Sequence, residues 1–163
     1  MSTICLKDNI MAADTQMSSG DMLSSLDFCK LKIHQHDGIR YAMAFCGDVA
    51  DMDVFYTWFI HEGYEMNLDS ETPVLEEDFR AIVYKNDTSE VYFYSSRCIP
   101  TKMSQPISIG SGCEFAMGAM AHGASASESV SAAKKLCLYT GGHTDVIYLN
   151  DENFLVQRIE GYN

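Results

Sequence analysis

Short apolar runs bounded by turn sequences recur along the chain and predict a protein rich in β-strands. A hairpin is predicted where Asp37-Gly38 joins two such runs, because this dipeptide favours the tight turns between antiparallel strands. A shorter hairpin ends at Asp14, and the serine-rich and glycine-rich residues 17–25 after it are predicted to form a loop. The predicted strands cover residues 3–6, 10–13, 28–33, 39–45, 79–84, 90–94, 107–109, 146–149 and 154–159.

Three stretches of the chain have sequence patterns typical of helices instead of strands. From residue 49 apolar side chains recur every three or four positions up to Gly63, a residue type that commonly ends helices. Residues 114–122 are rich in Ala and Met and predict a closely packed helix. Ser125 and Glu128 have the spacing of a capping box, which predicts the start of a third helix. Because strands and helices are grouped rather than alternating, an α+β fold with helices covering sheets is expected.

Composition narrows the class of protein. The chain has 163 residues, 47% hydrophobic and 21% charged, which is typical of one globular domain over residues 1–163. Its net charge of −12 would repel nucleic acid and anionic membrane surfaces, so neither is an expected partner. The six cysteines form no C-x-x-C pair and are interpreted as reduced, mostly buried thiols. With no signal peptide or spanning segment recognised, a cytoplasmic protein is expected.

The acidic residues 66–78 contain Pro73 and predict a connection with at most one helical turn. This stretch is interpreted as a solvated face. His34 and His36 flank the Asp37-Gly38 turn. They are interpreted as exposed turn histidines rather than metal ligands, because no third ligand is evident.

The N-terminus carries the candidate chemistry. Met1 precedes a small residue, so its removal is expected to leave Ser2 with a free α-amine. Such a serine combines a nucleophilic hydroxyl with its own base, because an α-amine titrates near pH ~8. Most chains that begin in this way are ordinary processed proteins, so the hypothesis depends on the rest of the sequence.

Five short motifs occur in register with that serine. They are Ser-Thr-Ile from Ser2, Ala-Ala-Asp-Thr-Gln ending at Gln16, Phe-Cys-Gly-Asp ending at Asp48 and followed by Ala-Asp, Gly-Ser-Gly ending at Gly112, and Leu-Tyr-Thr-Gly-Gly ending at Gly142. Together they resemble the proteasome β-subunit and its bacterial relative HslV, among the N-terminal-nucleophile hydrolases of the threonine protease family. Short phage or bacterial HslV-like proteins look most similar. The resemblance implies a four-layer αββα sandwich.

The resemblance also implies a catalytic group. Ser2 falls at the position of the N-terminal threonine nucleophile. Asp14 matches the acidic residue that orients the catalytic lysine, and Lys30 matches that lysine by its spacing. Lys32, which shares a strand face with Lys30, is the second choice. Serine in place of threonine lacks the methyl group that restricts the rotamer, and the hairpin before Asp14 is shorter than in typical HslV.

Four further positions follow from the resemblance. Ala44 falls where the family usually has the glycine whose backbone N–H forms the oxyanion hole. Ser111 matches the serine that hydrogen-bonds the terminal amine. Cys137 stands where HslV also has cysteine. No cofactor is required, although carbonyl groups around Cys137 and Thr140 are candidate ligands of a monovalent cation such as Na⁺.

The expected activity is hydrolysis of peptide bonds in peptides or unfolded proteins. The resemblance implies a self-compartmentalised ring of identical subunits, with an ATP-dependent unfoldase as a candidate partner. Two alternatives stay open at this point. One is an inactive member of the family that acts in assembly or interaction, and the other is an N-terminal-nucleophile amidase for a small molecule.

Overall fold

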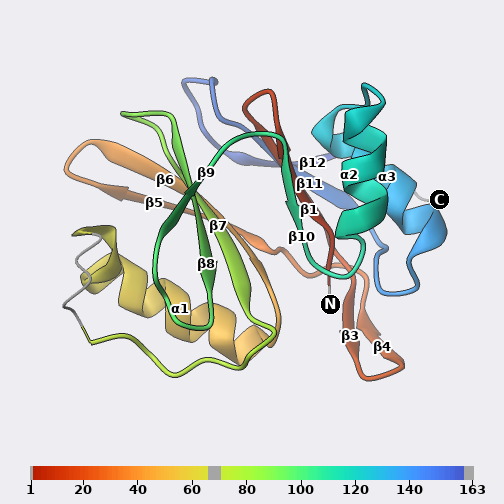
Figure 1. Cartoon of the computed structure of the whole chain (residues 1–163), viewed down its shortest axis with the longest axis horizontal. Coiled ribbons are helices and arrows are strands. Elements are labelled where there is room, and N and C mark those ends of the chain that lie inside the picture. Colours follow the sequence, from red (N-terminus) through yellow and green to blue (C-terminus); the bar gives the residue numbers. More distant parts are fainter. Residues whose placement is uncertain (1, 66–70, 160–163) are drawn as a thin grey trace.

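The computed structural model describes residues 2–65 and 71–159, and it forms layers of sheets and helices. The first sheet is antiparallel and has the strand order β10-β1-β2-β11-β12 (Figure 1). It therefore combines the N-terminal hairpin with strands from the last third of the chain. Its members are β1 (Ile4–Lys7), β2 (Ile10–Asp14), β10 (Ile107–Ile109), β11 (Thr144–Tyr148) and β12 (Val156–Ile159).

The second sheet is also antiparallel, but its strands follow one another in chain order. The Asp37-Gly38 turn joins its first two strands, as predicted. The strands are β5 (Leu31–His36), β6 (Ile39–Cys46), β7 (Arg80–Lys85), β8 (Glu90–Ser95) and β9 (Thr101–Met103).

Helices cover the outer face of each sheet, so the predicted four-layer α+β architecture is confirmed (Figure 1). One helix packs on the second sheet through a cluster of aromatic rings. Two helices pack on the first sheet, where small alanine side chains allow close approach. The helices are α1 (Val49–His61), followed by the short 3-10 helix η1 (Gly63–Glu65), α2 (Cys113–Ala121) and α3 (Ala126–Leu136).

The N-terminal strand is buried on both of its faces. Ile4 and Leu6 point into the apolar core between the two sheets, and Cys5 points to the helix layer. Successive side chains of a strand alternate between its two faces. One face of β1 meets the second sheet and the other meets the helices, so side chains on both faces are apolar. This burial fixes the position of the chain immediately before β1, which is where the candidate nucleophile lies.

The capping box that the sequence predicts is present at the start of α3. The Ser125 hydroxyl accepts a hydrogen bond from the Glu128 backbone N–H, and the Glu128 carboxylate accepts one from the Ser125 N–H. All six cysteines are free thiols, and four of them are buried. None of the helices within the described ranges is long and apolar enough to cross a membrane.

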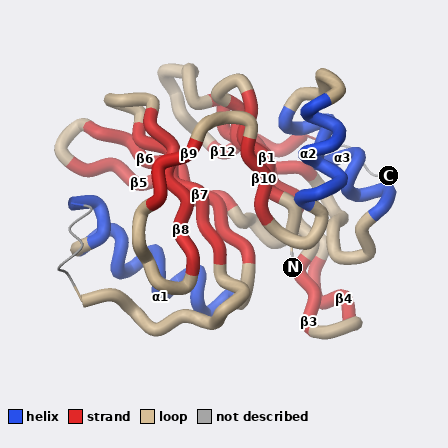
Figure 2. The backbone as a smooth tube through the Cα atoms, in the orientation of Figure 1, coloured by secondary structure: helices blue, strands red, loops and turns tan. Residues whose placement is uncertain are grey.

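The predicted loop over residues 17–25 is wrong. The structure instead has a two-stranded hairpin, β3 (Met17–Ser19) and β4 (Met22–Ser25), which projects from the body of the molecule (Figures 1 and 2). The positive φ of Gly20 allows its tight turn. A hairpin that buries little apolar surface leaves no alternating pattern in the sequence, and the same reason explains why the exposed edge strand β9 was not predicted.

Of the acidic connection, residues 66–70 lie outside the described ranges, and residues 71–78 contain neither helix nor strand. The two turn histidines are partly buried rather than exposed. The His36 ring lies 4.2 Å from the ring of Tyr64, and His34 lies edge-on to Tyr56, because α1 and η1 pack across this end of the second sheet.

Candidate active site

Ser2 lies just before β1 and is held by the loop between β10 and α2. Its carbonyl oxygen accepts hydrogen bonds from the Gly112 backbone N–H at 3.4 Å and from the Ser111 hydroxyl at 3.3 Å. Only 1% of Ser2 is exposed, and its Oγ has no hydrogen-bond partner among the described residues. Buried hydroxyl groups are normally hydrogen-bonded, so an unpartnered one marks a site with a role beyond stability.

Asp14, at the end of β2, gathers four hydrogen-bond donors in the core of the site. One carboxylate oxygen accepts from Lys30 Nζ at 2.7 Å and from the Thr3 N–H at 2.8 Å. The other oxygen accepts from the Gln16 N–H at 3.2 Å and the Gly141 N–H at 3.0 Å. Asp14 is fully buried, so this complete set of donors compensates for its desolvation.

Lys30 lies immediately before β5 and forms a buried ion pair with Asp14. Burial is the largest influence on the Lys30 amine and lowers its pKa, while the Asp14 carboxylate acts in the opposite direction. Lys32 lies elsewhere: its amine pairs with Asp53 at 2.8 Å and sits 4.5 Å from the Tyr56 ring centroid. The structure therefore brings Lys30, and not Lys32, to Asp14.

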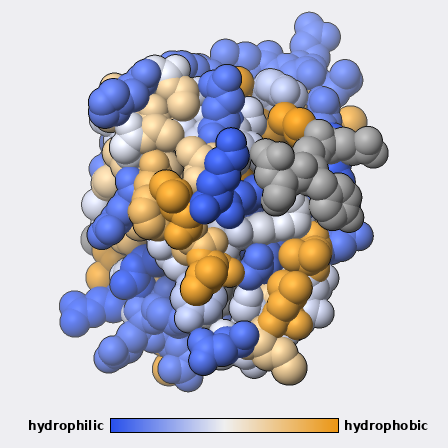
Figure 3. All heavy atoms as spheres, turned by 90° about the vertical axis from the view of Figure 1, so that its right-hand side faces the viewer, coloured by the Kyte–Doolittle hydropathy of each residue, from blue (hydrophilic) through white to orange (hydrophobic). Residues whose placement is uncertain are grey.

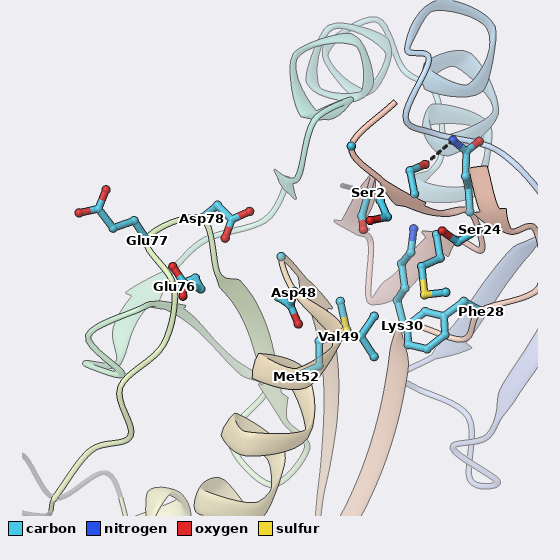
Figure 4. Close-up of a pocket in the computed structure, with 16 residues that line it drawn as sticks. Ser2, Ser24, Phe28, Lys30, Asp48, Val49, Met52, Glu76, Glu77 and Asp78 are labelled. Atoms are coloured by element: carbon cyan, nitrogen blue, oxygen red, sulfur yellow. Dashed lines mark hydrogen bonds between the residues drawn. The ribbon is translucent and has the colours of Figure 1, made fainter. Parts of the chain in front are cut away.

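A cleft of about 680 Å³ opens beside these residues. Ser2 and Lys30 lie on one wall, and Glu76, Glu77 and Asp78 lie on the facing wall (Figure 4). The β3–β4 hairpin contributes further lining residues on the Ser2 side. The cleft is open to solvent, and Ser2 lines it although the Ser2 Oγ is itself buried.

Ala44 is not at the cleft. It is fully buried in the middle of β6, where its register partners are Leu31 and Ile82, and its side chain belongs to the core between the sheets. A backbone N–H enclosed between two paired strands cannot reach a substrate, so the placement predicted for this residue is corrected. Gly47, just beyond the end of β6, does line the cleft, with a φ of 117°.

The other residues taken from the resemblance are distributed around the N-terminus. Ser111 contacts the Ser2 carbonyl oxygen, as described above. The Cys137 carbonyl accepts the Thr140 N–H at 3.2 Å in a turn, and the Thr140 hydroxyl lies 2.6 Å from the Thr3 hydroxyl. Within residues 2–65 and 71–159, no three side chains of His, Cys, Asp or Glu gather as a metal site.

Sequence reasoning missed several parts of this site. Gln16 and Gly141 supply backbone donors to Asp14, and Gly47 lines the cleft. The first two stand inside motifs that the sequence displays, but no motif indicates which backbone N–H points at a carboxylate. The acidic wall was interpreted as a solvated face because sequence gives no sign of what lies opposite it.

Gly110 supports the nucleophile directly. Its φ is 96°, and a Cβ added there would lie 2.0 Å from the Ser2 carbonyl oxygen. Gly123 has nearly the same φ, 97°, but open space around it. Gly110→Ala is therefore expected to lower the free energy of unfolding by about 1–3 kcal/mol more than Gly123→Ala, through overpacking against Ser2. Urea denaturation of the two variants measures the difference, and equal losses would contradict this close approach.

The arrangement of sheets and helices is the proteasome-like fold. Anbu (ancestral β-subunit) from Yersinia bercovieri matches with a TM-score of 0.70 at 12% identity, over 100% of this chain and 88% of that one. A Gly-1 mutant of Anbu from Hyphomicrobium sp. strain MC1 gives 0.72 at 11%, over 99% and 88%. BPH from Thiobacillus denitrificans, in complex with epoxomicin, gives 0.62 at 15%, over 98% and 99%.

These likenesses show the fold and extend over nearly the whole chain. The fold that they support is proteasome-like, and they do not point to HslV in particular. No family model matches the sequence, and no curated protein matches it.

Proposed function

We propose that this chain is a proteasome-like peptidase whose nucleophile is the Ser2 hydroxyl, exposed together with its α-amine by removal of Met1. One observation carries the proposal. A buried hydroxyl without a hydrogen-bond partner lines an open cleft that also contains a buried lysine, Lys30, paired with Asp14. The proteasome-like fold supports the same conclusion, because Ser2 lies immediately before β1, the first strand of the first sheet.

The proposed reaction has two halves. Ser2 Oγ attacks the amide carbonyl carbon while its proton passes to the α-amine, and the charged Lys30 stabilises the developing negative charge. The C–N bond then breaks, the leaving amine takes the proton, and an ester remains on Ser2. In the second half, the α-amine accepts a proton from water, the resulting hydroxide attacks the ester, and the proton returns to Oγ.

The oxyanion needs backbone N–H donors at the cleft. Ala44 is enclosed in the sheet, so Gly47 is the proposed replacement on the β6 side. A Cβ on Gly47 would lie 2.9 Å from the Phe79 Cα, so this position is confined to glycine by its neighbour as well as by its φ.

Peptides and unfolded proteins are the proposed substrates, in a closed ring of copies that an ATP-dependent unfoldase would feed. Exposed apolar side chains on the hairpin and on the helix side offer surface for contacts between copies (Figure 3). They include Met22, Leu23, Leu136 and Leu138. Sedimentation velocity measures the assembly, and a stable monomer would remove the ring from the proposal.

A monovalent cation such as Na⁺ stays part of the proposal at the Cys137 and Thr140 carbonyl groups. Among the described residues, the Cys137 carbonyl accepts one hydrogen bond, from the Thr140 N–H, so it retains a lone pair for an ion. A bound cation would brace the turn that precedes Gly141, the residue that donates to Asp14.

Intact mass and covalent labelling test the peptidase. The purified native protein is expected to lack Met1, and epoxomicin, the ligand of the Thiobacillus structure, is expected to add one adduct per chain. Ser2→Ala should abolish the adduct. Ser24→Ala removes another hydroxyl from the same cleft and should still give it.

Three outcomes would contradict the proposal. A native mass that retains Met1 would block the α-amine and favour an assembly or interaction protein. An adduct on Ser2→Ala would place the nucleophile elsewhere. Ser2-dependent hydrolysis of a small amide, with no peptide cleaved, would identify an amidase instead.

A further inference from the structure

The wall of the cleft opposite Ser2 is acidic. Asp48, Glu76, Glu77 and Asp78 all line the cleft and are exposed. None of them takes part in an ion pair among the described residues. Lys30 is the one basic residue that lines the cleft within the described ranges, and Asp14 already pairs with it. Asp48 accepts a hydrogen bond from the Ala50 N–H at the start of α1, and the Arg80 guanidinium donates to the Glu77 and Phe79 carbonyl oxygens beside the wall. No ion pair among the described residues neutralises the four carboxylates, so the cleft holds an excess of negative charge.

Apolar side chains also line the cleft, together with serines of the β3–β4 hairpin. Val49 and Met52 of α1 lie below the acidic wall, and Phe28 lies beside Lys30 (Figure 4). Lysine and arginine side chains combine an apolar stem with a cationic end. This cleft offers an apolar surface for such a stem and carboxylates for its end.

Exposed carboxylates alone are common on a protein with a net charge of −12, so their position relative to Ser2 decides their meaning. Ser2 lines this same cleft, although only 1% of the residue is exposed. Its hydroxyl group is buried and lacks a hydrogen-bond partner among the described residues. A ligand bound in the cleft would supply the hydrogen bond that this hydroxyl lacks. The ligand that meets Ser2 therefore also faces the acidic wall.

We propose that the cleft selects peptides in which a lysine or arginine supplies the carbonyl group that Ser2 attacks. This inference rests on the proposed peptidase function and adds its substrate class. The proposal assigns the side chain in the cleft to the acyl part of the substrate, which stays bound to Ser2 as the ester while the amine part departs. Glutamate or aspartate at the same position meets carboxylates and is rejected.

Peptide amides that differ only in that residue test the selection. With lysine, arginine, leucine and glutamate compared, kcat/KM is expected to be at least about tenfold higher for lysine and arginine than for leucine, and lowest for glutamate. The preference should decline at high salt, because exposed charges are screened.

Neutralising the wall should remove the preference. The variant Glu76→Gln, Glu77→Gln, Asp78→Asn is expected to lower the lysine-to-leucine ratio of kcat/KM about tenfold. A control with Glu62→Gln, Glu114→Gln and Glu152→Gln changes the net charge equally, at exposed residues outside the cleft, and should keep the ratio.

Failure of the inference and failure of the peptidase give different results. A native enzyme that prefers leucine, or a ratio that the wall variant leaves unchanged, overturns the selection while Ser2-dependent hydrolysis stands. No hydrolysis of any substrate overturns the peptidase. In that case, the affinities of the peptides for Ser2→Ala, measured by calorimetry, still test the cleft. The lysine peptide is expected to bind at least about tenfold more tightly than the glutamate peptide. Equal affinities overturn the selection.

Discussion

Replacing Asp14 by alanine is expected to lower the free energy of unfolding by about 3–5 kcal/mol. The change leaves the Lys30 amine charged and buried without its partner, 2.7 Å from where the carboxylate was. It also removes the acceptor of three backbone N–H groups, on Thr3, Gln16 and Gly141. Urea denaturation with a constant m-value measures the loss.

Asp53→Ala is the matched control for this variant. It breaks the ion pair with Lys32, which has nearly the same length, 2.8 Å, but lies at the surface. An exposed pair of this kind is worth less than about 1 kcal/mol. Equal losses for the two variants would show that burial and the additional donors of Asp14 do not set its contribution.

Lys30→Met is expected to reduce kcat of the Ser2-dependent hydrolysis by about 10²–10³-fold. Methionine keeps the length and apolar stem of the side chain but removes the charge that stabilises the transition state. Lys32→Met, on the surface beside Asp53, should leave kcat within about twofold. A loss that is equal in both variants would contradict the assignment of Lys30, and folding of each is checked by circular dichroism.

The pH profile separates the charge of Lys30 from its shape. Burial lowers the pKa of the Lys30 amine below its usual 10.5, so the native enzyme loses this charge at a lower pH than an ordinary lysine would. As the pH increases, the rate therefore rises when the α-amine loses its proton near pH ~8. It then falls when Lys30 loses its charge, which happens before the pH reaches 10.5. Lys30→Arg stays charged across this range, so its residual activity should lack the alkaline decline.

Much of the fold followed from local sequence signals. The Asp37-Gly38 turn, the capping box of α3 and the apolar face of α1 each predicted an element that the structure contains. The β3–β4 hairpin and β9 escaped because their strands face solvent, where no apolar alternation is required. The pairing of β2 with β11 joins residues more than 120 positions apart, and no local pattern encodes such a contact.

The candidate site divides in the same way. Ser2, Asp14 and Lys30 were predicted from the resemblance to the proteasome and HslV, and the structure brings them together. Ala44 was misplaced because spacing within a strand does not say where the strand leaves the sheet, and the chain after β6 reaches the cleft from Gly47 onward. The functions of these residues stay predictions until the kinetic experiments are done.

The four donors around Asp14 also set the order of events during synthesis. They come from residues 3, 16, 30 and 141, so the last of them leaves the ribosome only when most of the chain has been made. Until that turn closes on Asp14, Lys30 has an incomplete anchor and the surroundings of Ser2 are unfinished. In the peptidase proposed above, a chain that ends before residue 141 therefore lacks one of the four donors to Asp14, and the site is complete only in the finished fold.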